Sequence, residues 1–201
     1  MMKKQVSMAL KILIKVTVFM TLMLSISCNE SEYSKVVKRE MAKGVVNDSL
    51  FFGLKFGDTR KTFYDICWVL NKDGVIMQGP KNSFVQYNLP KKKNDSTTKD
   101  IRMLFYGIFN EKKIMTGLDM KFSYEAWALW NKSLQSDQLA IVLQDSLISW
   151  FPGNDFIEVE LENIKGKSFI KVDGNRRIMI EPIKDSREVD VRIDDLSYKL
   201  K

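Results

Sequence analysis

The strongest constraint on the fold is a two-residue alternation of apolar and charged side chains near the end of the chain. Across 157–162 apolar residues alternate with glutamates: Ile157, Val159 and Leu161 against Glu158, Glu160 and Glu162. The stretch 189–194 has the same pattern, with valine and isoleucine between aspartate and arginine. This period turns one side of a strand toward a core and the other toward water, which is typical of antiparallel sheets.

Other segments have the composition of strands and are joined by turn-forming residues. They are Val75–Met77, Phe84–Tyr87, Ile101–Phe109, Lys113–Phe122, Lys167–Val172 and Arg176–Glu181. The tripeptides Asn110-Glu111-Lys112 and Asp173-Gly174-Asn175 each separate two such segments, and both predict a hairpin.

Two helical regions are predicted from apolar residues at helical spacing. The first follows a cap at Asp58 or Thr59, carries Phe63, Ile66, Cys67 and Leu70, and ends at Gly74. The second follows a cap at Ser123, carries Tyr124, Trp127, Trp130 and Leu134, resumes at Leu139, Val142, Leu143 and Leu147, and stops at Pro152. We therefore expect an α+β domain over 50–201, an antiparallel sheet with helices packed on one face.

The two halves of this domain share a pattern. GLKFGDTRKTF from Gly53 aligns without gaps on GLDMKFSYEAW from Gly117. The alignment predicts two tandem strand–helix–three-strand units, with pseudo-repeats at 50–116 and 117–201. Chance similarity between amphipathic segments is the alternative, and it stays open.

The N-terminal part of the chain reads as an export signal. Lysines precede an uncharged apolar run, Val16–Ile26, which ends at Ser27-Cys28. The run is too short to span a bilayer, which needs about 20 residues. We predict a lipoprotein signal peptide at 1–27. A lipidated Cys28 and a polar tether would then occupy 28–49. A short basic helix on the lipid headgroups, with Tyr33, Val36, Val37 and Met41 on one side and a cap at Gly44, is the alternative.

Leu24-Ser25-Ile26-Ser27-Cys28 resembles the lipobox of bacterial lipoproteins, in which the cysteine receives the lipid and becomes the mature N-terminus. Glu30 and Glu32 resemble the acidic surface-export signal of Bacteroidota lipoproteins. These resemblances imply a protein of the cell envelope, anchored by lipid at the outer membrane, on either its periplasmic face or the cell surface.

Composition excludes several classes of function. Removing 1–27 removes four lysines and lowers the formal charge from +7 to +3, too little for a nucleic-acid binder. Cys67 is then the only cysteine besides Cys28, so no internal disulfide forms, and we expect a buried thiol. The absence of histidine excludes Ser-His-Asp and Cys-His catalysis and the commonest zinc sites. We expect no cofactor.

The remaining route to an enzyme is a carboxylate-based hydrolase. A glycosidase needs two opposed carboxylates across a cleft, whereas Glu158, Glu160 and Glu162 share one strand face. Asp190, Asp194 and Asp195 lack the loop spacing of a calcium motif. We therefore predict no catalytic residue and no metal site.

Two further features are candidates for binding. Tyr124, Trp127 and Trp130 form a dense aromatic group, which is either core or an exposed stripe for a glycan or a partner. The basic stretch KKKNDSTTK at 91–99 predicts a mobile hairpin loop, with a phosphate-binding or lipopolysaccharide-binding patch as the alternative.

Phe56-Gly57-Asp58-Thr59 before a helix, followed by strands and the hairpin YGIFNEKKI, resembles a known class of module. The class comprises the small helix-plus-sheet modules of the outer-membrane assembly lipoprotein and the β-lactamase-inhibitor-protein fold. The resemblance covers about Leu50 to Phe122 and implies a module that binds another protein with a sheet face. We therefore expect a non-catalytic binding or assembly-accessory lipoprotein, and glycan binding through Trp127 and Trp130 is the alternative.

Overall fold

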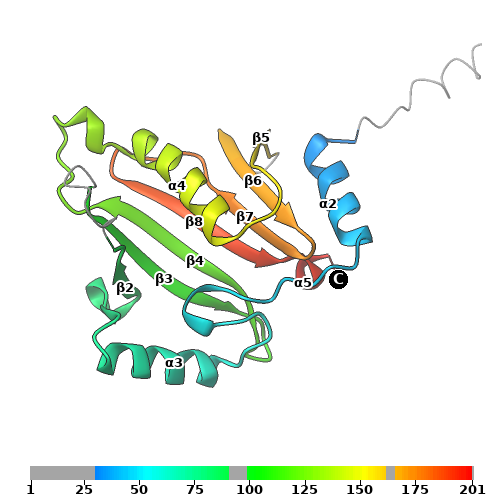
Figure 1. The fold of residues 1–201 in the computed structure, drawn as a ribbon, viewed down its shortest axis with the longest axis horizontal. Helices are drawn as coiled ribbons and strands as arrows, with labels where there is room; N and C mark the ends of the chain where they lie inside the picture. The colour runs from blue at the N-terminus through cyan, green and yellow to red at the C-terminus, as the bar shows by residue number, and fades with distance from the viewer. Residues whose placement is uncertain (1–29, 91–98, 162–165, 201) are drawn as a thin grey trace, which may run out of the picture. The chain divides into compact units, whose positions relative to one another are not determined.

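The computed structural model describes residues 30–90, 99–161 and 166–200. The predicted signal peptide and Cys28 lie outside the described residues. The chain divides into two units, 1–31 and 32–201, and the second unit holds the folded domain. This domain consists of helices and one antiparallel sheet, which confirms the predicted α+β class (Figure 1). No helix of the described residues is long and apolar enough to cross a membrane.

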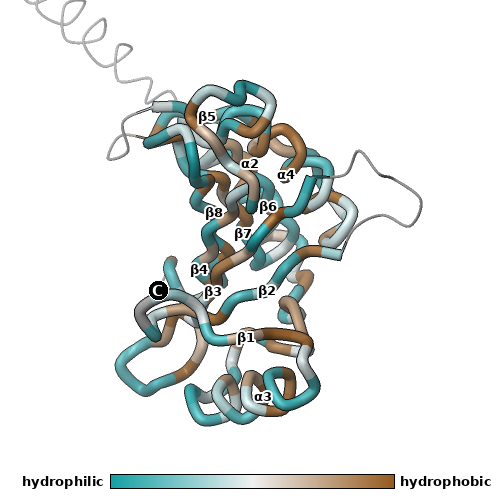
Figure 2. The backbone as a smooth tube through the Cα atoms, turned by 90° about the vertical axis from the view of Figure 1, so that its left-hand side faces the viewer, coloured by the Kyte–Doolittle hydropathy of each residue, from teal (hydrophilic) through white to brown (hydrophobic). Residues whose placement is uncertain are grey.

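The sheet has eight strands in the order β1-β2-β3-β4-β8-β7-β6-β5. Figure 2 shows β1, beside α3, at one end of the domain and β5 at the other. The strands are β1 Met77–Gln78, β2 Val85–Asn88, β3 Ile101–Phe109, β4 Met115–Tyr124, β5 Ile157–Glu160, β6 Lys167–Asp173, β7 Arg176–Ile180 and β8 Glu188–Asp195. The two predicted hairpins are confirmed, because β3 pairs with β4 and β6 pairs with β7.

The domain contains two successive units, each with one long helix followed by four neighbouring strands. Helix α3, Arg60–Lys72, precedes β1–β4, and helix α4, Ser136–Trp150, precedes β5–β8. The units join where β4 pairs with β8. The predicted repeat boundary at Gly117 is wrong, because it falls inside β4. The aligned segments also differ in structure, since Gly53 leads into a turn and α3, whereas Gly117 continues a strand.

The main core lies between one face of the sheet and the two long helices. Phe63 and Cys67 of α3 pack on this face, and so do three leucines of α4. The strands contribute alternate residues to it, among them Phe105, Met120 and Val191, which lie side by side across β3, β4 and β8. Cys67 is buried as predicted, and burial raises the pKa of its thiol to about 11.

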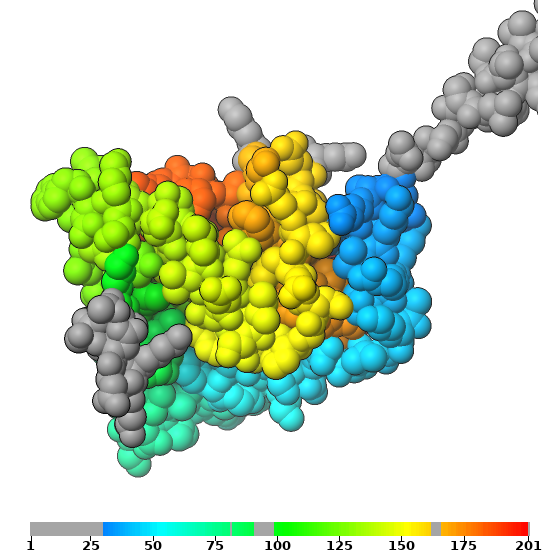
Figure 3. Space-filling view, turned by 45° about the horizontal axis from the view of Figure 1, so that its top comes forward, coloured from blue at the N-terminus to red at the C-terminus, as the bar shows by residue number. Residues whose placement is uncertain are grey.

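The opposite face of the sheet is covered at one end by α2, Glu32–Ala42, and α5, Leu196–Lys199. The predicted polar tether is therefore wrong from residue 32 onward. The apolar side of α2 is the one predicted for the alternative helix, but it packs on β5–β7 instead of lying on headgroups. Figure 3 shows α2, in blue, against the yellow and orange segments. Val37 of α2 is buried beside Ile170 and Met179.

The helix predicted to begin at Ser123 begins at Ser136. Strand β4 continues to Tyr124, because Ser123 is paired on both sides, with Arg102 of β3 and Glu188 of β8. Turns and a short 3-10 helix at Lys132–Leu134 follow before α4. The side chain of Gln135 holds these turns by donating to backbone carbonyls, including that of Ala128 at 3.0 Å.

Candidate functional site

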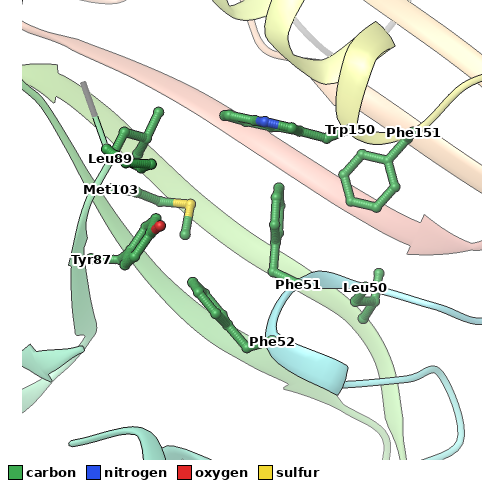
Figure 4. A pocket seen from close by; sticks show the side chains of 9 residues that line it. Leu50, Phe51, Phe52, Tyr87, Leu89, Met103, Trp150 and Phe151 are labelled. Carbon is green, nitrogen blue, oxygen red and sulfur yellow. The ribbon is translucent and has the colours of Figure 1, made fainter. Parts of the chain in front are cut away.

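An open cleft on the face of the sheet that carries α3 and α4 is the candidate site. Its volume is about 360 Å³, within the range of small-ligand sites. We call it the aromatic cleft, because five of its nine lining residues are aromatic (Figure 4). The lining residues are Leu50, Phe51, Phe52, Tyr87, Leu89, Pro90, Met103, Trp150 and Phe151. They come from three segments far apart in the chain, 50–52, 87–90 and 150–151, and from Met103 of β3.

The short helix at Phe51–Gly53 positions two of the rings. Phe52 has φ +61°, a left-handed conformation that is strained for an aromatic residue. The strained backbone turns the Phe52 ring onto Phe105, with centroids 5.3 Å apart, and against Tyr87 at 4.9 Å. Strain of this kind persists where the surrounding packing fixes it, and it is commonly found at binding sites.

Phe51 joins the cleft to the end of α4. Its ring meets Trp150 edge-on at 5.3 Å and Phe151 at 5.0 Å. Behind Phe151, the guanidinium of Arg176 lies 4.7 Å from the ring centroid. Phe51, Trp150 and Phe151 therefore form a continuous aromatic wall.

Two polar groups face this apolar surface. They are the hydroxyl of Tyr87 and the indole N–H of Trp150, which Figure 4 shows at opposite sides of the cleft. Neither group has a hydrogen-bond partner among the described residues. The cleft can therefore take an apolar group and offer it one donor, the indole N–H, and one hydroxyl that both donates and accepts. Its described lining includes no charged side chain.

The sequence-predicted aromatic group does not form one stripe. Tyr124 is buried in β4 and only 3% exposed, whereas Trp130 is 86% exposed in the turns before α4. Trp127 is half-buried, and its indole N–H donates to the Ser186 carbonyl at 2.8 Å. The three residues lie on a strand and a turn instead of one helix, so the common face predicted for them is wrong.

The acidic candidates lie apart from the cleft and are held by cations. Glu158 pairs with Lys167 at 2.6 Å, whereas Glu162 lies outside the described residues. Asp190 contacts Lys121 at 2.6 Å and Lys184 at 3.0 Å. Although burial raises the pKa of Asp190, these hydrogen bonds lower it more. The part of the chain that the structure describes has no group of three or more acidic, cysteine or histidine residues that could bind a metal.

Asp194 and Asp195 have structural partners. Arg177 and Arg192 donate to Asp194, and Asp195 caps α5 by accepting from the Ser197 N–H. The half-buried Asp119 differs from these aspartates because its pKa is raised. Burial is the largest cause, and the charge of Arg192 opposes it. Asp119 lies on the outward side of β4, away from the aromatic cleft.

Residues 91–98 of the predicted basic loop at 91–99 lie outside the described residues. Lys99, the last residue of that stretch, donates to the carbonyl of Ser133, and its ammonium lies 5.2 Å from the Tyr124 ring centroid. Lys99 therefore serves packing at this end of the domain.

The sequence contained only a weak signal for the cleft. The run Leu50-Phe51-Phe52 was recognisable as the first apolar cluster, but it has neither helical nor strand periodicity. Tyr87 and Trp150 stood out in no pattern, because each belongs to the end of an element. Comparisons with protein-family models, curated proteins and solved structures gave no match.

Proposed function

We propose that the protein is a lipid-anchored, non-catalytic binding module of a Gram-negative cell envelope. Cys28 attaches it to the outer membrane, and the aromatic cleft takes apolar side chains of a protein partner in that membrane. The observation that carries the proposal is the cleft, with five aromatic rings around an open volume of about 360 Å³. Trp, Tyr, Phe and Met are the residues enriched at the centres of protein interfaces.

The chemistry of the cleft favours binding over catalysis. The indole N–H of Trp150 donates and the hydroxyl of Tyr87 donates or accepts, so the two groups can orient a peptide unit of a partner. The buried carboxylates Asp194 and Glu40 lie elsewhere and are neutralised by arginine and lysine side chains. A carboxylate held in this way is a poor general acid or base, because its pKa lies far from neutral pH.

The position of α2 favours a partner in the same membrane. Only Asn29, Glu30 and Ser31 separate Cys28 from the first residue of α2. Even fully extended, these residues place Cys28 at most about 14 Å from the first residue of α2. The lipid would therefore hold the sheet close to the bilayer, where membrane proteins and their exposed apolar segments are within reach.

Lipidation is the first testable part of the proposal. We expect Cys28→Ala to abolish fatty-acid labelling and to leave the protein uncleaved or soluble in the periplasm, because the several acyl chains of a lipoprotein hold it firmly. Mass spectrometry of the envelope protein gives the N-terminus directly. An intact, unmodified Met1 would contradict the anchor.

The cleft is tested with a photo-crosslinking amino acid placed at position 150 or, as the control, at position 130. Both positions hold a tryptophan, but Trp130 lies before the N-terminal end of α4 and Trp150 at its C-terminal end. We expect a discrete protein adduct in intact cells from position 150 alone.

Trp150→Ala should then weaken binding of that purified protein by about tenfold, and Trp130→Ala should leave it unchanged. Equal adducts at both positions, or adducts to lipid alone, would contradict a protein-binding cleft.

A further inference from the structure

A second hollow of different chemistry lies between α3 and the β1–β2 hairpin. Its volume is about 550 Å³, and we call it the helix groove. Phe63, Cys67 and Ile76 form its buried floor. The rim carries Trp68 and other side chains that project into solvent. The groove shares no lining residue with the aromatic cleft, so its function is a separate question.

The rim exposes aromatic surface to solvent. Trp68 is 66% exposed and Tyr64, one helical turn before it, is 51% exposed. The Tyr64 hydroxyl is fixed by a 2.8 Å hydrogen bond with the hydroxyl of Tyr106 on β3. Met77 extends the same surface and is also about half exposed. Contiguous apolar surface of this kind on a folded domain commonly marks a binding site.

Apart from Asp65, the polar side chains of the groove are carboxamides and hydroxyls. Asn71, Gln78 and Asn82 lie along it, and a carboxamide both donates and accepts hydrogen bonds. Asn71 donates its N–H to the Ile76 carbonyl at 3.2 Å, which fixes the side chain and leaves its oxygen as an acceptor. These groups surround the aromatic surface, whereas the polar groups of the aromatic cleft are one hydroxyl and one indole N–H.

The charge of the groove is balanced. Asp65 is the one carboxylate among the described lining residues, and Lys61 pairs with it at 2.6 Å. The described lining includes no lysine or arginine. The nearest described ammonium, that of Lys72, lies 5.7 Å from the Trp68 ring centroid at the rim and is not part of the lining. The described lining therefore suits a neutral molecule with both apolar and hydroxyl-rich surface.

We propose that the helix groove binds a neutral oligosaccharide. A sugar ring has an apolar face of C–H groups, which can lie on the exposed Trp68 ring, and an edge of hydroxyls that donate and accept. The carboxamides of Asn71, Gln78 and Asn82 satisfy that edge. The glycan-binding role considered for Trp127 and Trp130 is thereby placed on a different tryptophan, one that lines a groove.

The test is affinity electrophoresis of the folded domain through gels containing soluble neutral β-glucan, xylan, mannan or galactan. Calorimetry with oligosaccharides of the retarding polymer then gives the affinity. We expect retardation by at least one polymer, with affinity reduced about tenfold or more in Trp68→Ala. Trp130→Ala is the matched control, because Trp130 is a still more exposed tryptophan outside the groove. Asn82→Ala, on the exposed rim, is the second variant and should also weaken binding.

Absence of retardation in every gel would overturn the proposal, and so would equal losses in Trp68→Ala and Trp130→Ala. A Trp68→Ala variant that binds glycan normally but loses the cross-linked protein partner would assign the groove to protein binding instead. Trp150→Ala should leave glycan binding unchanged. Failure of the aromatic-cleft function and failure of the glycan site are therefore separate outcomes.

Discussion

Replacing Asp194 with asparagine is expected to lower the free energy of unfolding by about 3–5 kcal/mol. The Asp194 side chain is 1% exposed, and its two oxygens receive three cationic groups. Arg177 donates at 2.5 and 3.2 Å, and Arg192 and Lys199 approach to 2.9 Å. Asparagine has nearly the same shape but no charge, so the buried guanidinium of Arg177 would lose its counter-ion.

Asp190→Asn is the matched control for this experiment. Asp190 lies on the same strand and the same face, contacts two lysines, and has an 18% exposed side chain. Because solvent screens partly exposed pairs, we expect a loss of about 1 kcal/mol or less. Urea denaturation of both variants near neutral pH measures the difference. Equal losses would contradict the importance assigned to burial at Asp194.

The Asp194 network also predicts loss of stability in acid. Burial raises the pKa of Asp194, but Arg177, Lys199 and Arg192 lower it more, so the pKa in the folded protein lies below the ordinary 3.8. A carboxyl with a lowered pKa contributes stability above its unfolded pKa and loses that contribution as the pH falls through the folded pKa. The difference between the wild type and Asp194→Asn should therefore shrink below a pH of about 4.

The strands and hairpins could be predicted because their signals are local. Alternation in 189–194 identifies β8, and Asp173-Gly174-Asn175 identifies the β6–β7 turn without knowledge of any distant residue. The helical spacing of Tyr124, Trp127 and Trp130 gave a wrong prediction because the interactions that decide this segment are not local. Strand partners of β4, around Ile101 and Glu188, override the local helical pattern, and they lie far away in the sequence.

The aromatic cleft could not be predicted because tertiary topology alone assembles it. Phe52 reaches Tyr87 and Phe105 through a left-handed backbone conformation that no composition pattern indicates. Trp150 reaches Phe51, about 100 residues earlier in the chain, because α4 packs on β4 and β8 and ends beside the cleft. Similarly, the spacing of Val36 and Val37 indicated a helix, but its partner surface on β5–β7 is contributed by residues 157–180.

Removing α2 is expected to destabilise the domain strongly, although the sequence pattern placed the start of the fold near Leu50. A chain that begins at Leu50 exposes the apolar side chains of β5–β7 that α2 covers, including Ile170 and Val172. It also loses the hydrogen bond from Arg177 to the Tyr33 hydroxyl, at 2.6 Å. We expect the free energy of unfolding to fall by about 3 kcal/mol or more relative to a chain that begins at Asn29, since fully burying one such side chain contributes about 1.5–3 kcal/mol.

Point variants separate packing of α2 from the effect of shortening the chain. Val37→Ala removes a buried contact and should cost about 1–2 kcal/mol, whereas Lys35→Ala, on the exposed side of the same helix, should change stability by less than about 0.5 kcal/mol. Urea melts of all four proteins provide the measurement. Equal stability of the chains beginning at Asn29 and Leu50 would restore the tether interpretation. A large loss means instead that α2 is an integral part of the folded domain.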